Sequence, residues 1–124
     1  MHQLWHAITA AMASWHQSKL FLEHAVAISH DSLHVLVGVP LWLALALILR
    51  RPVTSWTPWL WLLAFILWNE TVDLWMERWP DAGMQYGEGA KDVALTMLVP
   101  TLLLFAARAR PDLFRVAPRR GRRR

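Results

Sequence analysis

The chain has 124 residues, of which 56% are hydrophobic and 18% are charged, and its formal charge at pH 7 is +4. This length allows one small domain, and the composition is more apolar than that of an ordinary soluble domain. No cysteine is present, which excludes disulfide scaffolds, thiolate metal sites and cysteine nucleophiles.

The first segment, residues 1–29, predicts an amphipathic helix rather than a membrane span. Its apolar residues recur at spacings of three, four and seven, which places them on one stripe of a helix. The stripe consists of Leu4, Ile8, Ala11, Met12, Trp15 and Leu22. A helix of this kind lies in the plane of a membrane interface. We therefore expect residues 1–29 to form an interfacial segment on the outer surface.

Three apolar stretches that are almost free of charge follow. They begin at residues 33, 56 and 93 and read LHVLVGVPLWLALALIL, WTPWLWLLAFILW and VALTMLVPTLLLFAA. A membrane-spanning helix needs ~20 mostly apolar residues, so we predict three spans, at about Ser32–Leu49, Thr57–Arg78 and Asp92–Arg108. The predicted fold is an all-α integral membrane protein in which residues 30–109 form a three-helix transmembrane domain. The alternative is a soluble protein with three buried helices, which a chain this short could hardly cover.

The connections between the spans differ in composition and charge. The segment Ala82–Lys91 is rich in glycine and is predicted to be a loop between the second and third spans. Because consecutive spans alternate in direction, Arg50, Arg51 and the basic tail (residues 110–124) fall on one side, and eight acidic residues fall on the other. Arg and Lys are retained in the cytoplasm. We therefore expect a cytoplasmic C-terminus, an extracytoplasmic N-terminus, and a tail that binds anionic lipid headgroups rather than nucleic acid.

Ionisable residues of all three spans are expected at one depth. His34 and Asp92 each lie 16 residues from the arginine that ends their span, or about 24 Å along a helix. Glu70 and Asp73 share one face of the second span with Glu77. An ionised group at the bilayer centre costs at least ~2.5–3.5 kcal/mol, so these groups must be paired, hydrated, protonated or liganded. The predicted ligand-binding residues are His34, Glu70, Asp73, Lys91 and Asp92.

Several interpretations of this polar site stay open. His30 and His34, four residues apart, could share a divalent metal with Glu70 and Asp73 on the facing helix. An anionic lipid headgroup is a second candidate, because glycines and Lys91 directly precede the predicted start of the third span. A structural polar network that holds three short helices together is a third. Asp31 and Asp92 could also simply cap their helices.

The order of these residues resembles the VanZ-like family of small bacterial membrane proteins. In that family an Asp and a nearby His open a span, a later span carries Glu-x-x-Gln, and a final span begins with Asp followed four residues later by Asn. The matching positions here are Asp31 and His34, then Glu70 with Asp73 in place of Gln, then Asp92 with Thr96 in place of Asn. The family is associated with low-level glycopeptide (teicoplanin) resistance. The resemblance, over about Ser29–Leu104, therefore implies a bacterial inner-membrane protein with an outward-facing polar site.

Two hypotheses for the function result. The first is an envelope protein that binds a lipid-linked or amphiphilic ligand, with a divalent metal as a possible cofactor. The second is an accessory subunit of a larger membrane complex, because nine tryptophans on three helices leave wide apolar faces; a homo-oligomer would cover the same faces. The sequence shows no Ser–His–Asp arrangement, but Glu70 or Asp73 beside His34 leaves acid–base chemistry open, so catalysis stays undecided.

Overall fold

The computed structural model describes residues 2–26, 29–77 and 79–114. This part of the chain forms α1 (His2–Val26), α2 (His30–Ile48), α3 (Trp56–Met76), α4 (Ala82–Ala109) and a short 3₁₀ helix, η1 (Pro111–Phe114). None of the described residues forms a strand, so the all-α prediction is confirmed. Within the same residues two helices, α2 and α4, are long and apolar enough to cross a membrane.

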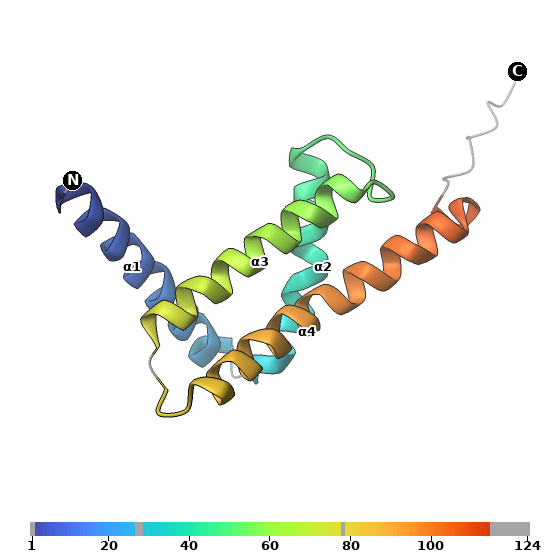
Figure 1. Cartoon of the computed structure of the whole chain (residues 1–124). Helices are drawn as coiled ribbons and strands as arrows, with labels where there is room; N and C mark the ends of the chain where they lie inside the picture. The colour runs from blue at the N-terminus through green and yellow to red at the C-terminus, as the bar shows by residue number, and fades with distance from the viewer. Residues whose placement is uncertain (1, 27–28, 78, 115–124) are drawn as a thin grey trace, which may run out of the picture.

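Helices α2, α3 and α4 pack against one another, and α1 lies across the C-terminal half of α3 (Figure 1). Side-chain contacts fix their directions. His30 and His34 of α2 contact Asp92 and Thr96 of α4, respectively, so α2 and α4 run parallel. On α3, Trp59 donates to Thr101 of α4 over 2.9 Å, while Glu70 lies beside Gly89, so α3 runs antiparallel to α4.

The glycine-rich segment 82–91 is helical, so the prediction of a loop there is wrong. Asp81 ends the connection from α3, and its carboxylate accepts hydrogen bonds from the backbone N–H groups of Gly83 and Met84, at 2.7 and 3.2 Å. This cap starts α4 ten residues earlier than predicted. Asp92 therefore lies inside the helix and does not cap it. In the same way Ser29, rather than Asp31, caps α2.

Helix α2 ends in a Schellman motif. The backbone N–H of Arg51 bonds to the carbonyl of Ala46, and that of Arg50 bonds to the carbonyl of Leu47. Arg50 has a φ of 50°, a left-handed conformation that glycine adopts more easily. The turn directs the chain from α2 back into α3 and leaves both arginines exposed at this end of the molecule.

A small apolar core joins the three packed helices. It is built from Trp42, Leu62, Ile66, Met97 and Leu104. Next to it, Gly38 of α2 lies directly against the backbone carbonyl of Thr96, and a Cβ atom at Gly38 would overlap that carbonyl. The absence of a side chain at Gly38 therefore allows α2 and α4 to approach closely.

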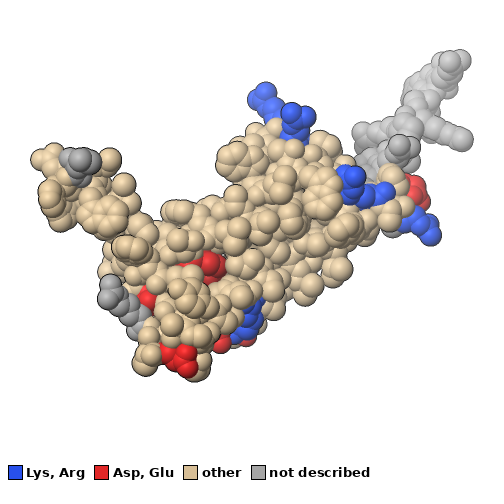
Figure 2. Space-filling view, in the orientation of Figure 1, with Lys and Arg blue, Asp and Glu red and all other residues tan. Residues whose placement is uncertain are grey.

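Opposite charges gather at opposite ends of the helices (Figure 2). Acidic side chains gather where α3 ends and α4 begins, whereas arginines gather at the α2–α3 connection and the end of α4. Arg108 of α4 also donates a hydrogen bond to the carbonyl of Thr54, over 3.1 Å, which ties the two arginine-bearing segments together. The predicted basic tail lies outside the described residues from position 115 onward.

Outward-facing apolar residues cover much of the remaining surface. Four tryptophans in or just after α3 are exposed: Trp61, Trp68, Trp75 and Trp79. In the predicted interfacial segment, Leu4, Ile8 and Trp15 are exposed as well, whereas the side chain of Leu22 lies outside the described part. This surface suits an apolar environment better than water.

Candidate functional site

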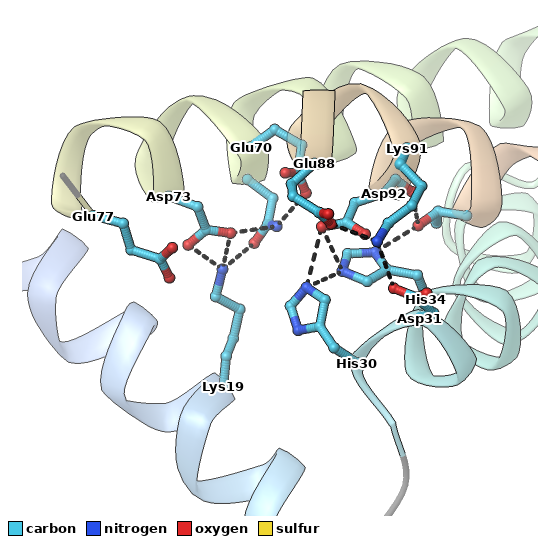
Figure 3. Close-up of polar contacts among 12 residues, drawn as sticks. Lys19, His30, Asp31, His34, Glu70, Asp73, Glu77, Glu88, Lys91 and Asp92 are labelled. Carbon is cyan, nitrogen blue, oxygen red and sulfur yellow. Dashed lines mark hydrogen bonds and ion pairs between the residues drawn. The ribbon is translucent and has the colours of Figure 1, made fainter. Parts of the chain in front are cut away.

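The acidic end of the molecule holds two groups of polar side chains, which Figure 3 shows around Lys19 and around His30. The Lys19 cluster joins α1 to α3 and consists of His16, Lys19, Asn69, Asp73 and Glu77. The His30 cluster joins α2 to α4 and consists of His30, His34, Asp92 and Thr96. Each cluster thus links helices that are far apart in the sequence.

In the Lys19 cluster a lysine ammonium compensates a carboxylate. Lys19 Nζ contacts both carboxylate oxygens of Asp73 and donates to Asn69 Oδ1 over 3.1 Å. His16 adds a 3.0 Å contact from Nδ1 to Asp73 and lies 3.7 Å from Glu77. Asn69 occupies the centre, because its amide nitrogen donates to Asp73 at 3.2 Å. The indole N–H of Trp15 also donates to Asn69 Oδ1, over 3.0 Å, and fastens α1 to α3.

In the His30 cluster a buried carboxylate faces two imidazoles. Asp92 is 5% exposed, and its Oδ2 lies 3.1 Å from His30 Nε2 and 3.7 Å from His34 Nε2. The Thr96 hydroxyl donates to the backbone carbonyl of Asp92 over 2.8 Å, so its oxygen accepts from His34 Nδ1 at 2.9 Å. This arrangement keeps the His34 proton on Nδ1 and leaves the Nε2 lone pair pointing at His30 and Asp92.

Two of the predicted site residues, Glu70 and Lys91, belong to neither cluster. Glu70 is buried between α3 and α4, and its Oε1 accepts a hydrogen bond from Asn69 over 3.1 Å. Lys91 points outward, where it pairs with Glu88 and, over 3.1 Å, with Asp31. Lys91 therefore balances two exposed carboxylates rather than the buried ones.

The predicted site residues thus all lie at one end of the helices, but in different groups. His34 and Asp92 belong to the His30 cluster, and Asp73 belongs to the Lys19 cluster. Among the described residues, the set of close ligand atoms around His30 and His34 is completed by Asp92 and includes neither Glu70 nor Asp73.

Sequence reasoning did not assign Lys19, His16, Asn69 or Thr96 to the site. A signal existed for two of them. Asn69 precedes Asp73 by four residues and Thr96 follows Asp92 by four, so each pair shares a helix face. His16 and Lys19 carried no such signal, because nothing in the sequence places α1 across α3.

Two cavities open beside these clusters. One, of about 290 Å³, has a polar end at the Lys19 cluster and an apolar remainder formed by Leu33, Val37, Leu41, Phe65 and Ile66. We call it the amphipathic groove. The other, of about 470 Å³, is lined by residues of α2, α3, α4 and the connection between α3 and α4, and these include His30, Glu70, Asp92 and four further carboxylates. The His30 cluster therefore borders both spaces.

Comparison of the chain with known proteins finds no matching family model, no matching curated protein and no matching solved structure.

The hydroxyl of Thr96 gives a test of this geometry. Thr96→Val preserves shape but removes the acceptor for His34 Nδ1 in a residue that is 1% exposed. We expect the free energy of unfolding in mixed detergent micelles to fall by about 1–3 kcal/mol. Thr71→Val is the matched control, because the exposed Thr71 hydroxyl donates to a carbonyl of its own helix. Loss of this hydroxyl should change the free energy of unfolding by less than about 0.5 kcal/mol. Equal effects of both variants would contradict the described role of Thr96.

Proposed function

We propose that this chain is a VanZ-like protein of the bacterial inner membrane that binds an amphiphilic or lipid-linked envelope ligand at an extracytoplasmic polar site. The observation that carries the proposal is the amphipathic groove, in which hydrogen-bonding groups and apolar side chains line one cavity. Membership of the VanZ-like family rests on the sequence motifs around Asp31, Glu70 and Asp92.

Helix directions support α3 as a third span in this proposal. Helices α2 and α4 run parallel. Their C-terminal ends lie at the same end of the molecule, where Arg108 donates a hydrogen bond to Thr54. If both cross a membrane in the same direction, the chain between them must cross back. Helix α3 has 21 residues and is about 32 Å long, enough for a hydrocarbon layer of ~30 Å.

The distribution of charge supports the orientation. Arg50, Arg51 and Arg108 lie at one end of the proposed spans, and the two polar clusters lie at the other. Because Arg is retained on the cytoplasmic side, the clusters would face the outside of the cell and the C-terminus the cytoplasm. Helix α1, with its exposed apolar stripe, would lie in the outer interface.

The groove itself supports an amphiphile as the ligand. Its polar end offers the Lys19 ammonium, the Asn69 amide and the Asp73 carboxylate, which suit a hydrogen-bonding headgroup. Beyond them, Val37 and Leu41 of α2 face Phe65 and Ile66 of α3 across an apolar space. A purely polar solute would leave that part of the cavity without matching contacts, whereas an acyl or prenyl chain would fill it.

Filling the groove tests the proposal. Val37 lines the apolar part and is 40% exposed, so Val37→Trp should occupy that part without disturbing the core. The protein is reconstituted in vesicles with pyrene-labelled phosphatidylglycerol and extracted in mild detergent, and the label that co-elutes with the protein is measured. We expect Val37→Trp to retain about tenfold less label than the unmodified chain, a loss of about 1.4 kcal/mol in binding free energy.

The control is Leu36→Trp. Leu36 is the preceding residue, is exposed, and does not line the groove. This variant adds the same indole to the surface and should retain the label fully. If Val37→Trp and Leu36→Trp retain equal amounts of label, the groove does not bind the lipid.

A further inference from the structure

We propose that His30, His34 and Asp92 form a binding site for one divalent transition-metal ion of the zinc class. This inference does not depend on ligand binding in the amphipathic groove. It assigns Asp92 as the carboxylate ligand, together with the two histidines of α2.

The distances between the three ligand atoms fit a tetrahedral ion. His30 Nε2 lies 3.1 Å from Asp92 Oδ2 and 3.2 Å from His34 Nε2, and His34 Nε2 lies 3.7 Å from Asp92 Oδ2. With metal–ligand bonds of about 2.0–2.1 Å, tetrahedral angles separate two ligands by about 3.3–3.4 Å, and right angles by about 2.9 Å. The three observed separations scatter around the tetrahedral value, so the spacing of these atoms suits one shared ion. Two imidazoles and one carboxylate are also a ligand set that zinc accepts.

The orientation of His34 supports a metal ligand. Its Nδ1 donates to Thr96 at 2.9 Å, and the Thr96 hydroxyl is in turn fixed by the carbonyl of Asp92. A hydrogen bond from the second ring nitrogen is the usual feature that orients a metal-binding histidine. It directs Nε2 toward His30 and Asp92, the position that an ion would share.

The burial of Asp92 is the second, independent observation. Its carboxylate is nine-tenths buried, yet Oδ1 has no hydrogen-bond partner among the described residues. Across the same residues no lysine or arginine forms an ion pair with Asp92. A buried carboxylate normally has full compensation, and a bound cation would provide it.

The other groups of possible metal ligands differ in this respect. In the first group, His16 with Asp73 and Glu77, the Lys19 ammonium pairs with Asp73. The second group shares Asp92 and adds Asp31 and Glu88, both of which pair with Lys91. In both groups a lysine already supplies the positive charge. The His30 cluster is therefore the candidate that a metal ion suits best.

The site would leave one coordination position open. The larger cavity, of about 470 Å³, is bordered by His30 and Asp92 and reaches Glu70. Three protein ligands plus an open position are typical of zinc sites that bind a further oxygen ligand. Six carboxylates line this cavity, so a neutral oxygen ligand such as a water molecule is the class that such an ion would take from it.

The test is direct measurement of zinc binding. The full chain carries a tag without histidine, is stripped with a chelator, and is titrated with zinc chloride against a coloured zinc indicator. We expect one zinc ion per chain, and an affinity at least about 10–100-fold lower in His34→Gln and in Asp92→Asn, both of which preserve side-chain size. Thr96→Val should weaken binding as well, because it releases His34 from its orienting bond.

Controls exclude binding elsewhere. His16→Gln and Asp31→Asn alter the neighbouring groups and should leave the affinity unchanged. The exposed pair His2 and His6, four residues apart on α1, is a possible adventitious site, so both are replaced by Gln in a further control. X-ray absorption of the zinc-loaded, unmodified chain should show two imidazole ligands. If the unmodified chain binds no zinc, or if it loses zinc in the His2/His6 variant and keeps it in His34→Gln, the proposal is wrong.

Discussion

Gly38→Ala is expected to lower the free energy of unfolding by about 1–3 kcal/mol. The added methyl group would overlap the backbone carbonyl of Thr96, which cannot rotate away as a side chain would. Relief requires α2 to move away from α4, and His34 lies one turn before Gly38 on the same helix. We therefore expect lower stability in mixed micelles together with weaker zinc binding at the His30 cluster.

Gly87→Ala is the control for this prediction. Gly87 also lies inside a helix, but nothing lies within 4 Å of the position that a Cβ atom would take. Alanine favours a helix over glycine by about 0.5–1 kcal/mol, so this variant should be slightly more stable than the unmodified chain. If Gly38→Ala is stabilising to the same extent, α2 and α4 do not approach as closely as described.

Lys19→Met is expected to release α1 from α3. The Lys19 ammonium compensates Asp73, whose side chain is 21% exposed, and also bonds to Asn69. Removing one partner of a buried ion pair costs about 3–5 kcal/mol. Because solvent reaches both groups here, we expect about 1–3 kcal/mol. Faster hydrogen exchange of the backbone amides in the second half of α1 would report the release.

The matched control is Lys91→Met. Lys91 pairs with two exposed carboxylates at the surface, and exposed ion pairs contribute about 0–1 kcal/mol. The exchange rates of α1 should not change in this variant. If they increase as much as in Lys19→Met, the effect comes from net charge and not from the contact with Asp73.

Hydropathy predicted the main helices well, because an apolar stretch can be recognised without knowing its neighbours. The start of α4 was missed for a physical reason. Three glycines between positions 83 and 89 are typical of a loop, but all three lie inside α4, and Gly89 packs against Glu70 of α3. The Asp81 cap, followed directly by the helix, was the sequence signal that could have located this start.

The site was predicted less completely than the helices. Counting residues from the arginines placed His34 and Asp92 at the same level, and the structure brings them within 3.7 Å of each other. Which carboxylate faces the histidines depends on how each helix is rotated about its axis, and residue spacing does not fix that rotation. The place of Lys19 depends on the angle at which α1 crosses α3, which no pattern in α1 encodes.

Native mass spectrometry of the chain, expressed at its natural level and released in mild detergent, tests the proposed function most directly. A ligand-binding membrane protein should leave the membrane as a monomer or homo-oligomer that carries a discrete lipid mass, and a zinc ion would add its own mass to it. An accessory subunit should instead emerge with other polypeptides in a fixed ratio and without a bound lipid. That second result would contradict the proposed function and would make the acidic end of the helices an interface between subunits.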